Sequence, residues 1–312
     1  MSKKIKRALI ACALSAAVAF SAAFSACNMQ SNHPRAKITL SFNSVSYEIE
    51  YTLYRNMYPQ TVRHFIELAD AGFYDNMIVH NYNASSDWFT GAYGYNIAEG
   101  EEAVSYEDSY SNSSSEALKE YLSENSKEQA YYALAANGAL TPTVYKAVGE
   151  NGKPEGALPT LIGEFSANDH VIENNALTTK TGALKMFYYE KENPYRKAAI
   201  ITGSGQVLEH DYQYNCATSI FSMQVGTSTS YSADKYCVFG ELRDDNARDK
   251  LSELLDDIAD YLEDVGWSNS DFTTSVTTAV DEADSYAKPK NDATFTMTRM
   301  PLVIETVKIT KH

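Results

Sequence analysis

The residues whose types could do chemistry are His80 and Asn81, which follow the short apolar run Met77–Val79. An imidazole can act as a general base when a second group orients it, and an amide can donate a hydrogen bond to a reacting atom. The sequence offers no identifiable partner for His80, so the favoured interpretation is a structural histidine at a strand end. Asn81 then remains as an uncharged hydrogen-bond donor.

Other catalytic arrangements are missing from the sequence. There is no convincing Ser-His-Asp set, pair of carboxylates or metal-ligand spacing, and nothing calls for a cofactor. Gly203–Gly205 lacks the Gly-Lys-Ser/Thr that completes a phosphate-binding loop, which favours a flexible turn. The acidic residues between Asp256 and Glu263 are best interpreted as the solvated face of a helix.

A helix followed by a strand must position His80 and Asn81. Pro59 suits a first helical turn, and Gly72 can supply the left-handed residue that ends a helix. Apolar residues between them recur at helical spacing, at Val62, Phe65, Ile66 and Ala69. The run Met77–Val79 then favours a buried strand.

The first residues of the chain are typical of an export signal. Four basic residues precede the apolar run Ala8–Phe24, and Ser25-Ala26-Cys27 follows. This resembles the bacterial lipobox, which implies a mature chain beginning at a lipid-modified Cys27, although Leu is usual where Phe24 stands. The alternatives are an uncleaved membrane anchor or an ordinary signal cleaved near Ala26. Each places the folded part outside the cytoplasm.

We therefore predict a signal over residues 1–27, a tether over 28–36 and a folded domain over 37–312. Loss of residues 1–26 would remove four positive charges, so the formal net charge would change from −15 to −19. Nucleic acid is not an expected partner, because binding to phosphates needs clustered Lys and Arg. The oligomeric state stays open.

Only two cysteines lie in the predicted domain, Cys216 and Cys237. An exported protein could join them in a disulfide, and both also suit small buried positions in or beside strands. Both alternatives stay open.

Alternation predicts strands at 37–42, 45–54 and 301–309, the first two forming a hairpin. Asn246 is the predicted cap of an amphipathic helix that follows it. Long stretches near 95–141, 187–214 and 266–296 are predicted insertions, the first with one or two helices and the last partly helical. Such insertions tend to carry specificity.

Five ordered blocks of the sequence resemble the cyclophilin family of peptidyl-prolyl isomerases. The blocks comprise the helix and strand at 58–80, Leu161–Phe165, Gly182–Met186, Ala217–Met223 and Asp234–Leu242. The resemblance implies a mainly β fold with helices, namely a closed eight-stranded antiparallel barrel capped by two helices, here with helical insertions.

The resemblance also implies where substrate would bind. Asn81 stands where the family has its catalytic arginine, so its donor is weaker. The implied substrate-binding positions are Trp88, Thr90, Phe187, Tyr188, Ile220, Ser222, Tyr231 and Tyr236. Several differ from the residues that are usual in the family, with Ser222 at the position of a pocket Phe, Tyr231 at a Trp and Tyr236 at a His.

The sequence thus predicts an exported, cyclophilin-like isomerase that acts on Xaa-Pro bonds of exported proteins with reduced activity. The alternative is a non-catalytic lipoprotein of the same fold that holds a protein or extracellular ligand. A solute-binding lipoprotein fits the order of strands poorly. We expect Pro-containing polypeptide segments as partners, and attachment through Cys27 to the outer face of the bacterial cytoplasmic membrane.

Overall fold

The computed structural model describes most of the chain beyond residue 30, namely residues 31–111, 115–149, 151, 153–164, 170, 177–187, 196–201, 207–212, 216–227, 237–280 and 291–312. Residues 32–312 form one compact unit. The predicted signal with Cys27, and the predicted site residues Tyr188, Tyr231 and Tyr236, lie outside the described residues.

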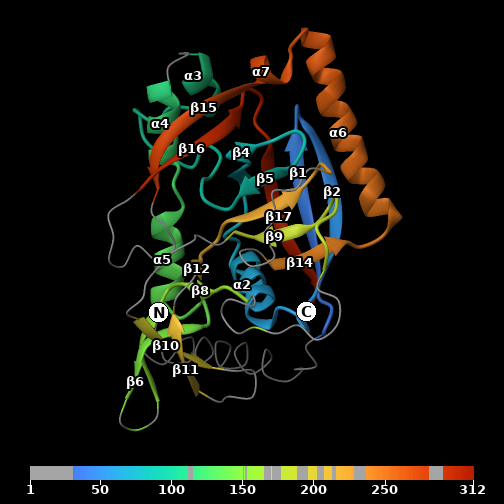
Figure 1. The fold of residues 1–312 in the computed structure, drawn as a ribbon. Helices are drawn as coiled ribbons and strands as arrows, with labels where there is room; N and C mark the ends of the chain where they lie inside the picture. The colour runs from blue at the N-terminus through green and yellow to red at the C-terminus, as the bar shows by residue number, and fades with distance from the viewer. Residues whose placement is uncertain are drawn as a thin grey trace, which may run out of the picture. The chain divides into compact units, whose positions relative to one another are not determined.

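The centre of this unit is a curled antiparallel sheet with the strand order β3-β17-β1-β2-β14-β9-β13-β5-β4 (Figure 1). Its strands are β1 (Arg35–Phe42), β2 (Val45–Leu53), β3 (Met77–Ile78), β4 (Asn81–Tyr82), β5 (Asp87–Thr90), β9 (Leu184–Met186), β13 (Phe221–Gln224), β14 (Cys237–Leu242) and β17 (Val303–Lys311). The edge strands β3 and β4 are separated in the chain by only Val79 and His80. The predicted mainly β fold is confirmed, while closure of eight strands into a barrel stays a prediction.

Strands β1 and β2 form the predicted hairpin, and β17 pairs with the other side of β1. The hairpin turns at Asn43 and Ser44, which both have positive φ, at 47° and 67°. Two successive left-handed residues give a turn whose twist matches that of the flanking strands. The first and last strands of the domain lie side by side, and both are strands as the alternation in their sequences predicts.

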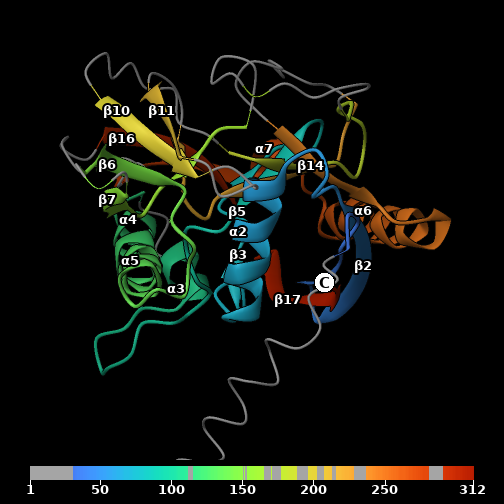
Figure 2. The ribbon, with the colours of Figure 1, turned by 90° about the horizontal axis from the view of Figure 1, so that it is seen from below.

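Helix α2 (Pro59–Asp70) is the predicted helix, and it begins and ends as expected. Glu164 is buried and accepts hydrogen bonds from the backbone N–H groups of Gln60 and Thr61, at 3.1 and 2.8 Å, which satisfies two free donors at the helix start. Gly72 has a φ of +67° and ends the helix. Figure 2 shows α2 between α5 on one side and β2 with α6 on the other.

Helix α6 (Asp245–Val265) packs against β2 through its buried face, formed by Ala247, Leu251, Leu254 and Ile258. The prediction that Asn246 caps this helix is wrong. The cap is Asp244, whose carboxylate accepts from the Ala247 N–H at 3.0 Å. Asp and Asn are equally good caps, so the local sequence leaves the choice open.

The predicted insertion at 95–141 contains three helices rather than one or two, namely α3 (Tyr106–Ser111), α4 (Ser115–Glu124) and α5 (Glu128–Ala136). Short strand pairs follow in the chain: β6 (Val144–Val148) with β7 (Pro154–Leu158), β8 (Leu161–Ile162) with β12 (Cys216–Ala217), and β10 (Arg196–Ile201) with β11 (Val207–Tyr212). None of the described helices is both long and apolar enough to span a bilayer.

The described part of the stretch near 266–296 includes the short helix α7 (Asn269–Phe272), in agreement with its prediction as partly helical. Its main feature, which was not predicted, is a hairpin of β15 (Thr273–Val280) and β16 (Asn291–Thr298). Repeated Thr and Val explain the strands, since β-branched residues favour a pleated surface. Strand β16 lies against β4, and α4 lies against β15 (Figure 1).

Candidate functional site

Four neighbouring strands bring Asn81 into a row of side chains. Asn81 lies opposite Phe89, Phe89 opposite Ser222, and Ser222 opposite Lys185, on β4, β5, β13 and β9. Residues directly opposite each other on antiparallel strands share one face of the sheet. We call these four residues the Asn81 row.

Asn81 is held by the β15–β16 hairpin. Its Oδ1 accepts a hydrogen bond from the Thr296 N–H on β16 at 2.9 Å. The side chain is half-buried, and among the described residues none accepts a hydrogen bond from its Nδ2. The amide group can therefore donate to a molecule that docks on this face.

An aromatic pair lies next to Asn81. The rings of Phe89 and Phe187 are 5.4 Å apart and meet edge to face at 84°, and both side chains are half-buried. The Phe187 N–H donates to the Ile220 carbonyl at 3.1 Å, which places Phe187 beside another predicted site residue. The structure thus brings together Asn81, Phe187 and Ile220, and adds Phe89.

The far end of the Asn81 row is charged and closed to solvent. Lys185 Nζ lies 2.6 Å from Asp87 Oδ1, and the two side chains are 5% and 10% exposed. The hydroxyl oxygen of Ser222 is 3.5 Å from the same carboxylate oxygen. An ion pair therefore occupies this part of the face.

Trp88 and Thr90 point away from the Asn81 row, because successive residues of a strand alternate between faces. Trp88 is fully buried and stacks on Tyr82, with ring centres 5.6 Å apart. Thr90 is fully buried and donates from its hydroxyl to the Ile78 carbonyl at 2.9 Å. The structure does not bring these two predicted site residues together with Asn81.

Ile220 is half-buried and contributes to a small hollow of about 50 Å³ with Tyr132 and Phe295. The residue before it, Ser219, donates from its hydroxyl to the Gly91 carbonyl at 2.6 Å. A Cβ on Gly91 would lie 2.3 Å from the Ser219 carbonyl oxygen, so only glycine allows this close approach of the two segments.

His80 is a buried residue beneath the same face. The rings of Phe295 and Tyr93 surround it edge to face at 4.9 and 5.2 Å. Burial lowers the pKa of His80 to about 3, so the ring is neutral at physiological pH. Its Nδ1 is buried without a hydrogen-bond partner among the described residues. These features agree with its interpretation as a structural histidine.

Among the residues that the structure describes, no three His, Cys, Asp or Glu side chains cluster in a way that could hold a metal ion. Cys237 is buried, and its Sγ lies 3.6 Å from the Thr61 hydroxyl oxygen. The side chain of Cys216 lies outside the described ones, so the structure does not test whether Cys216 and Cys237 form a disulfide.

The sequence model of the cyclophilin type peptidyl-prolyl cis-trans isomerase/CLD family matches residues 37–275, which is most of the chain and includes the whole Asn81 row. The chain belongs to this cyclophilin family. Strand β16, which holds Asn81, lies beyond the matched residues. No curated protein matches the chain.

Solved structures similar to this cyclophilin-family chain include a cyclophilin type peptidyl-prolyl cis-trans isomerase of Cryptosporidium parvum, at 12% identity and a TM-score of 0.39, with 90% of this chain and 99% of that chain covered. A structure of the parasite protein in the presence of the dipeptide Ala-Pro has a TM-score of 0.36 at 12% identity, covering 89% of this chain and 99% of that chain. The Mimivirus cyclophilin has a TM-score of 0.37 at 12% identity, covering 91% of this chain and 92% of that one.

Sequence reasoning missed Phe89 and the ion pair of Lys185 with Asp87. A signal for Phe89 existed, because alternation along β5 puts it on the face opposite to Trp88 and Thr90. The ion pair joins residues 98 positions apart in the sequence, and no local pattern links them.

Proposed function

We propose that this chain is an exported cyclophilin-type isomerase that acts weakly on Xaa-Pro bonds of exported proteins. The observation that carries the proposal is the position of Asn81 directly opposite Phe89, whose ring contacts Phe187. A hydrogen-bond donor and a half-exposed aromatic surface are the two elements that this chemistry requires. A proline ring would rest on the aromatic pair, and Asn81 Nδ2 would donate to the prolyl nitrogen.

Isomerisation of an Xaa-Pro bond requires neither a nucleophile nor a cofactor. The C–N bond must lose its partial double-bond character against a barrier of ~18–20 kcal/mol. A donor that contacts the prolyl nitrogen stabilises the twisted state, in which that nitrogen becomes pyramidal and gains a lone pair. The interaction accelerates the reaction because it is stronger in the transition state than in the ground state.

Two features of the Asn81 row favour a low rate. The amide of Asn81 is neutral, and charge-assisted hydrogen bonds are about twice as strong as neutral ones. Loss of a well-placed electrostatic donor commonly costs ~2.7–4 kcal/mol, which corresponds to a rate lower by roughly two to three orders of magnitude. In addition, Ser222 and the ion pair of Lys185 with Asp87 leave no apolar hollow at the far end of the row.

The test is the rate of cis-to-trans conversion of a short Xaa-Pro peptide with the full chain and two variants. Asn81→Ala should reduce the catalysed rate to the uncatalysed one. The control variant Asn83→Ala changes an exposed asparagine in the next turn and should leave the catalysed rate unchanged. Equal rates with native protein and Asn81→Ala would contradict the role of Asn81.

A second candidate function is binding without catalysis, and the buried ion pair favours it. Lys185 and Asp87 occupy the face that would hold a proline ring, and the β15–β16 hairpin lies against β4 beside it. In that case the chain would hold a protein or extracellular ligand through other surfaces. A native protein that shows no acceleration would support this candidate over the first.

We further propose that the chain is lipid-anchored at Cys27 on the outer face of the bacterial cytoplasmic membrane. The support is the basic start, the apolar run Ala8–Phe24 and the small residues before Cys27. In bacteria that express the chain, Cys27→Ala should move the protein from the membrane fraction to the soluble exported fraction. Retention of Cys27→Ala in the membrane would point to an uncleaved anchor.

A further inference from the structure

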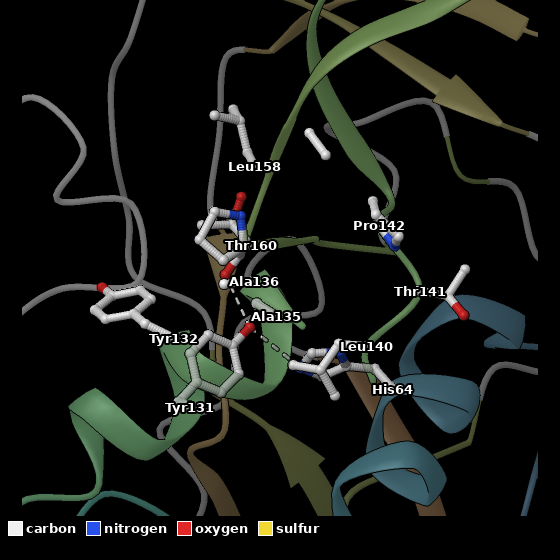
Figure 3. Close-up of a pocket in the computed structure, with 12 residues that line it drawn as sticks. His64, Tyr131, Tyr132, Ala135, Ala136, Leu140, Thr141, Pro142, Leu158 and Thr160 are labelled. Carbon is white, nitrogen blue, oxygen red and sulfur yellow. Dashed lines mark hydrogen bonds between the residues drawn. The ribbon is translucent and has the colours of Figure 1, made fainter. Parts of the chain in front are cut away.

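A cavity among the described residues lies beside the predicted first insertion, away from the Asn81 row. Its volume is about 490 Å³. Helix α5 forms one wall through Tyr131 and Tyr132, and residues 140–142 and 157–160 form much of the rest, with His64 of α2 at the base. Figure 3 shows the two tyrosines on one side and Thr141 and Pro142 on the other. We call it the α5 cavity.

The described residues that line the α5 cavity are mostly apolar and include no Asp, Glu, Lys or Arg. The lining residue whose ordinary pKa lies near neutrality is His64. Its Nε2 lies 2.8 Å from the Thr218 carbonyl oxygen, so this nitrogen carries the hydrogen. Burial is the largest cause that lowers the pKa of His64, to about 4, and the nearby Arg63 adds to it. The cavity is therefore uncharged at physiological pH.

Hydrogen bonds hold the walls of the cavity in place and leave one group unsatisfied. The Tyr131 hydroxyl donates to the Pro159 carbonyl at 2.8 Å (Figure 3), and the Thr143 hydroxyl donates to the Thr160 carbonyl at 3.1 Å. Thr160 also lines the cavity, but its hydroxyl is buried and has no partner among the described residues. Because this oxygen is closed to solvent and the hydroxyls of Tyr131 and Thr143 donate within the protein, the described walls present mainly apolar surface to a ligand.

We propose that the α5 cavity binds a neutral, largely apolar small molecule. The volume lies within the range of about 300–1,000 Å³ that is typical of small-molecule sites. Aromatic and aliphatic walls bury apolar area, while an anionic ligand would lose its hydration without gaining a cationic partner from the described lining. This site is separate from the proposed isomerase site.

A pair of fluorescent probes tests the charge preference. N-phenyl-1-naphthylamine is neutral, with two aromatic units and one N–H group, and 8-anilinonaphthalene-1-sulfonate adds a sulfonate to the same framework. Titration of the full chain should show the neutral probe binding at least tenfold more tightly than the anionic one. Equal affinities, or tighter binding of the sulfonate, would overturn the proposal.

Matched substitutions on α5 locate the binding. Ala135 lines the cavity and Ala133 is exposed on the same helix without lining it, so Ala135→Trp should abolish binding of the neutral probe and Ala133→Trp should not. If Ala135→Trp does not fold, Ala136→Trp serves instead, because Ala136 lines the cavity and is exposed. Binding that survives the cavity-lining substitutions would place the probe elsewhere and overturn the proposal. Both tests measure fluorescence, so their failure leaves the proposed isomerase function unaffected.

Discussion

The Asn81 row and the α5 cavity differ in what fills them. The row ends in a buried ion pair, Lys185 with Asp87, and its first residue is held by the β15–β16 hairpin. The cavity is open, apolar and uncharged, and helix α5 of the predicted first insertion forms one of its walls. In this chain the row on the central sheet ends in a charged pair, while the predicted first insertion forms one wall of an apolar volume.

The comparison shows why membership of a family and the state of a site must be argued separately. The sheet that positions Asn81 needs only the pairing of strands and a packed core. A charged pair can replace apolar residues on its outer face without changing that pairing, provided that both charges are satisfied. The fold therefore does not by itself fix the residues of the site.

The largest expected effect comes from breaking the ion pair. Lys185→Met should leave a buried Asp87 carboxylate without its partner and lower the free energy of unfolding by ~3–5 kcal/mol, measured with urea. The matched control is Lys37→Met, which breaks the pair with Glu48, whose side chains are 26% and 61% exposed. That change should cost less than ~1 kcal/mol. Equal costs would show that the pair in the Asn81 row is not buried as described.

The double variant of Lys185→Met with Asp87→Leu sharpens this test. Replacing both charges with apolar residues of similar volume is often neutral or stabilising. We therefore expect the double variant to recover most of the stability that Lys185→Met loses. A double variant as unstable as the single one would mean that packing, rather than an unpaired charge, causes the loss.

The next largest effect is the pH dependence of folding stability, to which one buried histidine in each region contributes. Burial lowers the pKa of His64 to about 4 and that of His80 to about 3, so the unfolded chain binds protons on both residues before the folded chain does. Stability is thus fully present above a pH of about 6.5 and falls as the pH decreases towards the folded pKa values. Each residue should remove about 2 kcal/mol between pH 7 and pH 5.

The variant His80→Phe separates the two contributions, because phenylalanine keeps the ring and cannot be protonated. Urea unfolding at pH 7 and pH 5 should show a drop smaller by about 2 kcal/mol in this variant than in the native chain. Identical drops in the two proteins would contradict the burial of His80 as a neutral ring.

The smallest effect concerns the contact between Asn81 and the β15–β16 hairpin. Asn81→Ala removes the acceptor of the Thr296 N–H and should lower the free energy of unfolding by about 1 kcal/mol. Amide hydrogen exchange should become faster at Thr296. In the control Asn83→Ala the faster exchange should occur at Ser85, whose N–H donates to the Asn83 amide oxygen at 2.9 Å. Unchanged exchange at Thr296 in Asn81→Ala would argue against the contact.

The elements with strong local signals could be predicted from the sequence. Pro59, the apolar stripe and Gly72 define α2, and the alternation at 37–54 defines the first hairpin. The stretch near 266–296 was predicted as partly helical, but its runs of Thr and Val form a hairpin that packs against β4 and α4. That packing depends on distant segments, so local propensity could not reveal it.

The candidate site was less predictable for a specific reason. Both faces of β5 are buried in large part, with Asp87 at 8% exposure and Trp88 at 0%, so hydrophobic alternation does not reveal which face meets the core. The prediction for Trp88 and Thr90 rests on the resemblance of their block to the family, and a shift of one residue exchanges the two faces of a strand.

The measurement that tests the account most directly is the catalysed rate of Xaa-Pro isomerisation with Asn81→Arg in the full chain. A guanidinium restores a charged donor, and Asn81 is half-buried, so the longer side chain can extend into solvent. Our account predicts that kcat/KM rises by roughly two to three orders of magnitude over the native chain. No increase in a folded variant would contradict it, and would mean that the ion pair and the hairpin, rather than the missing charge, limit the site.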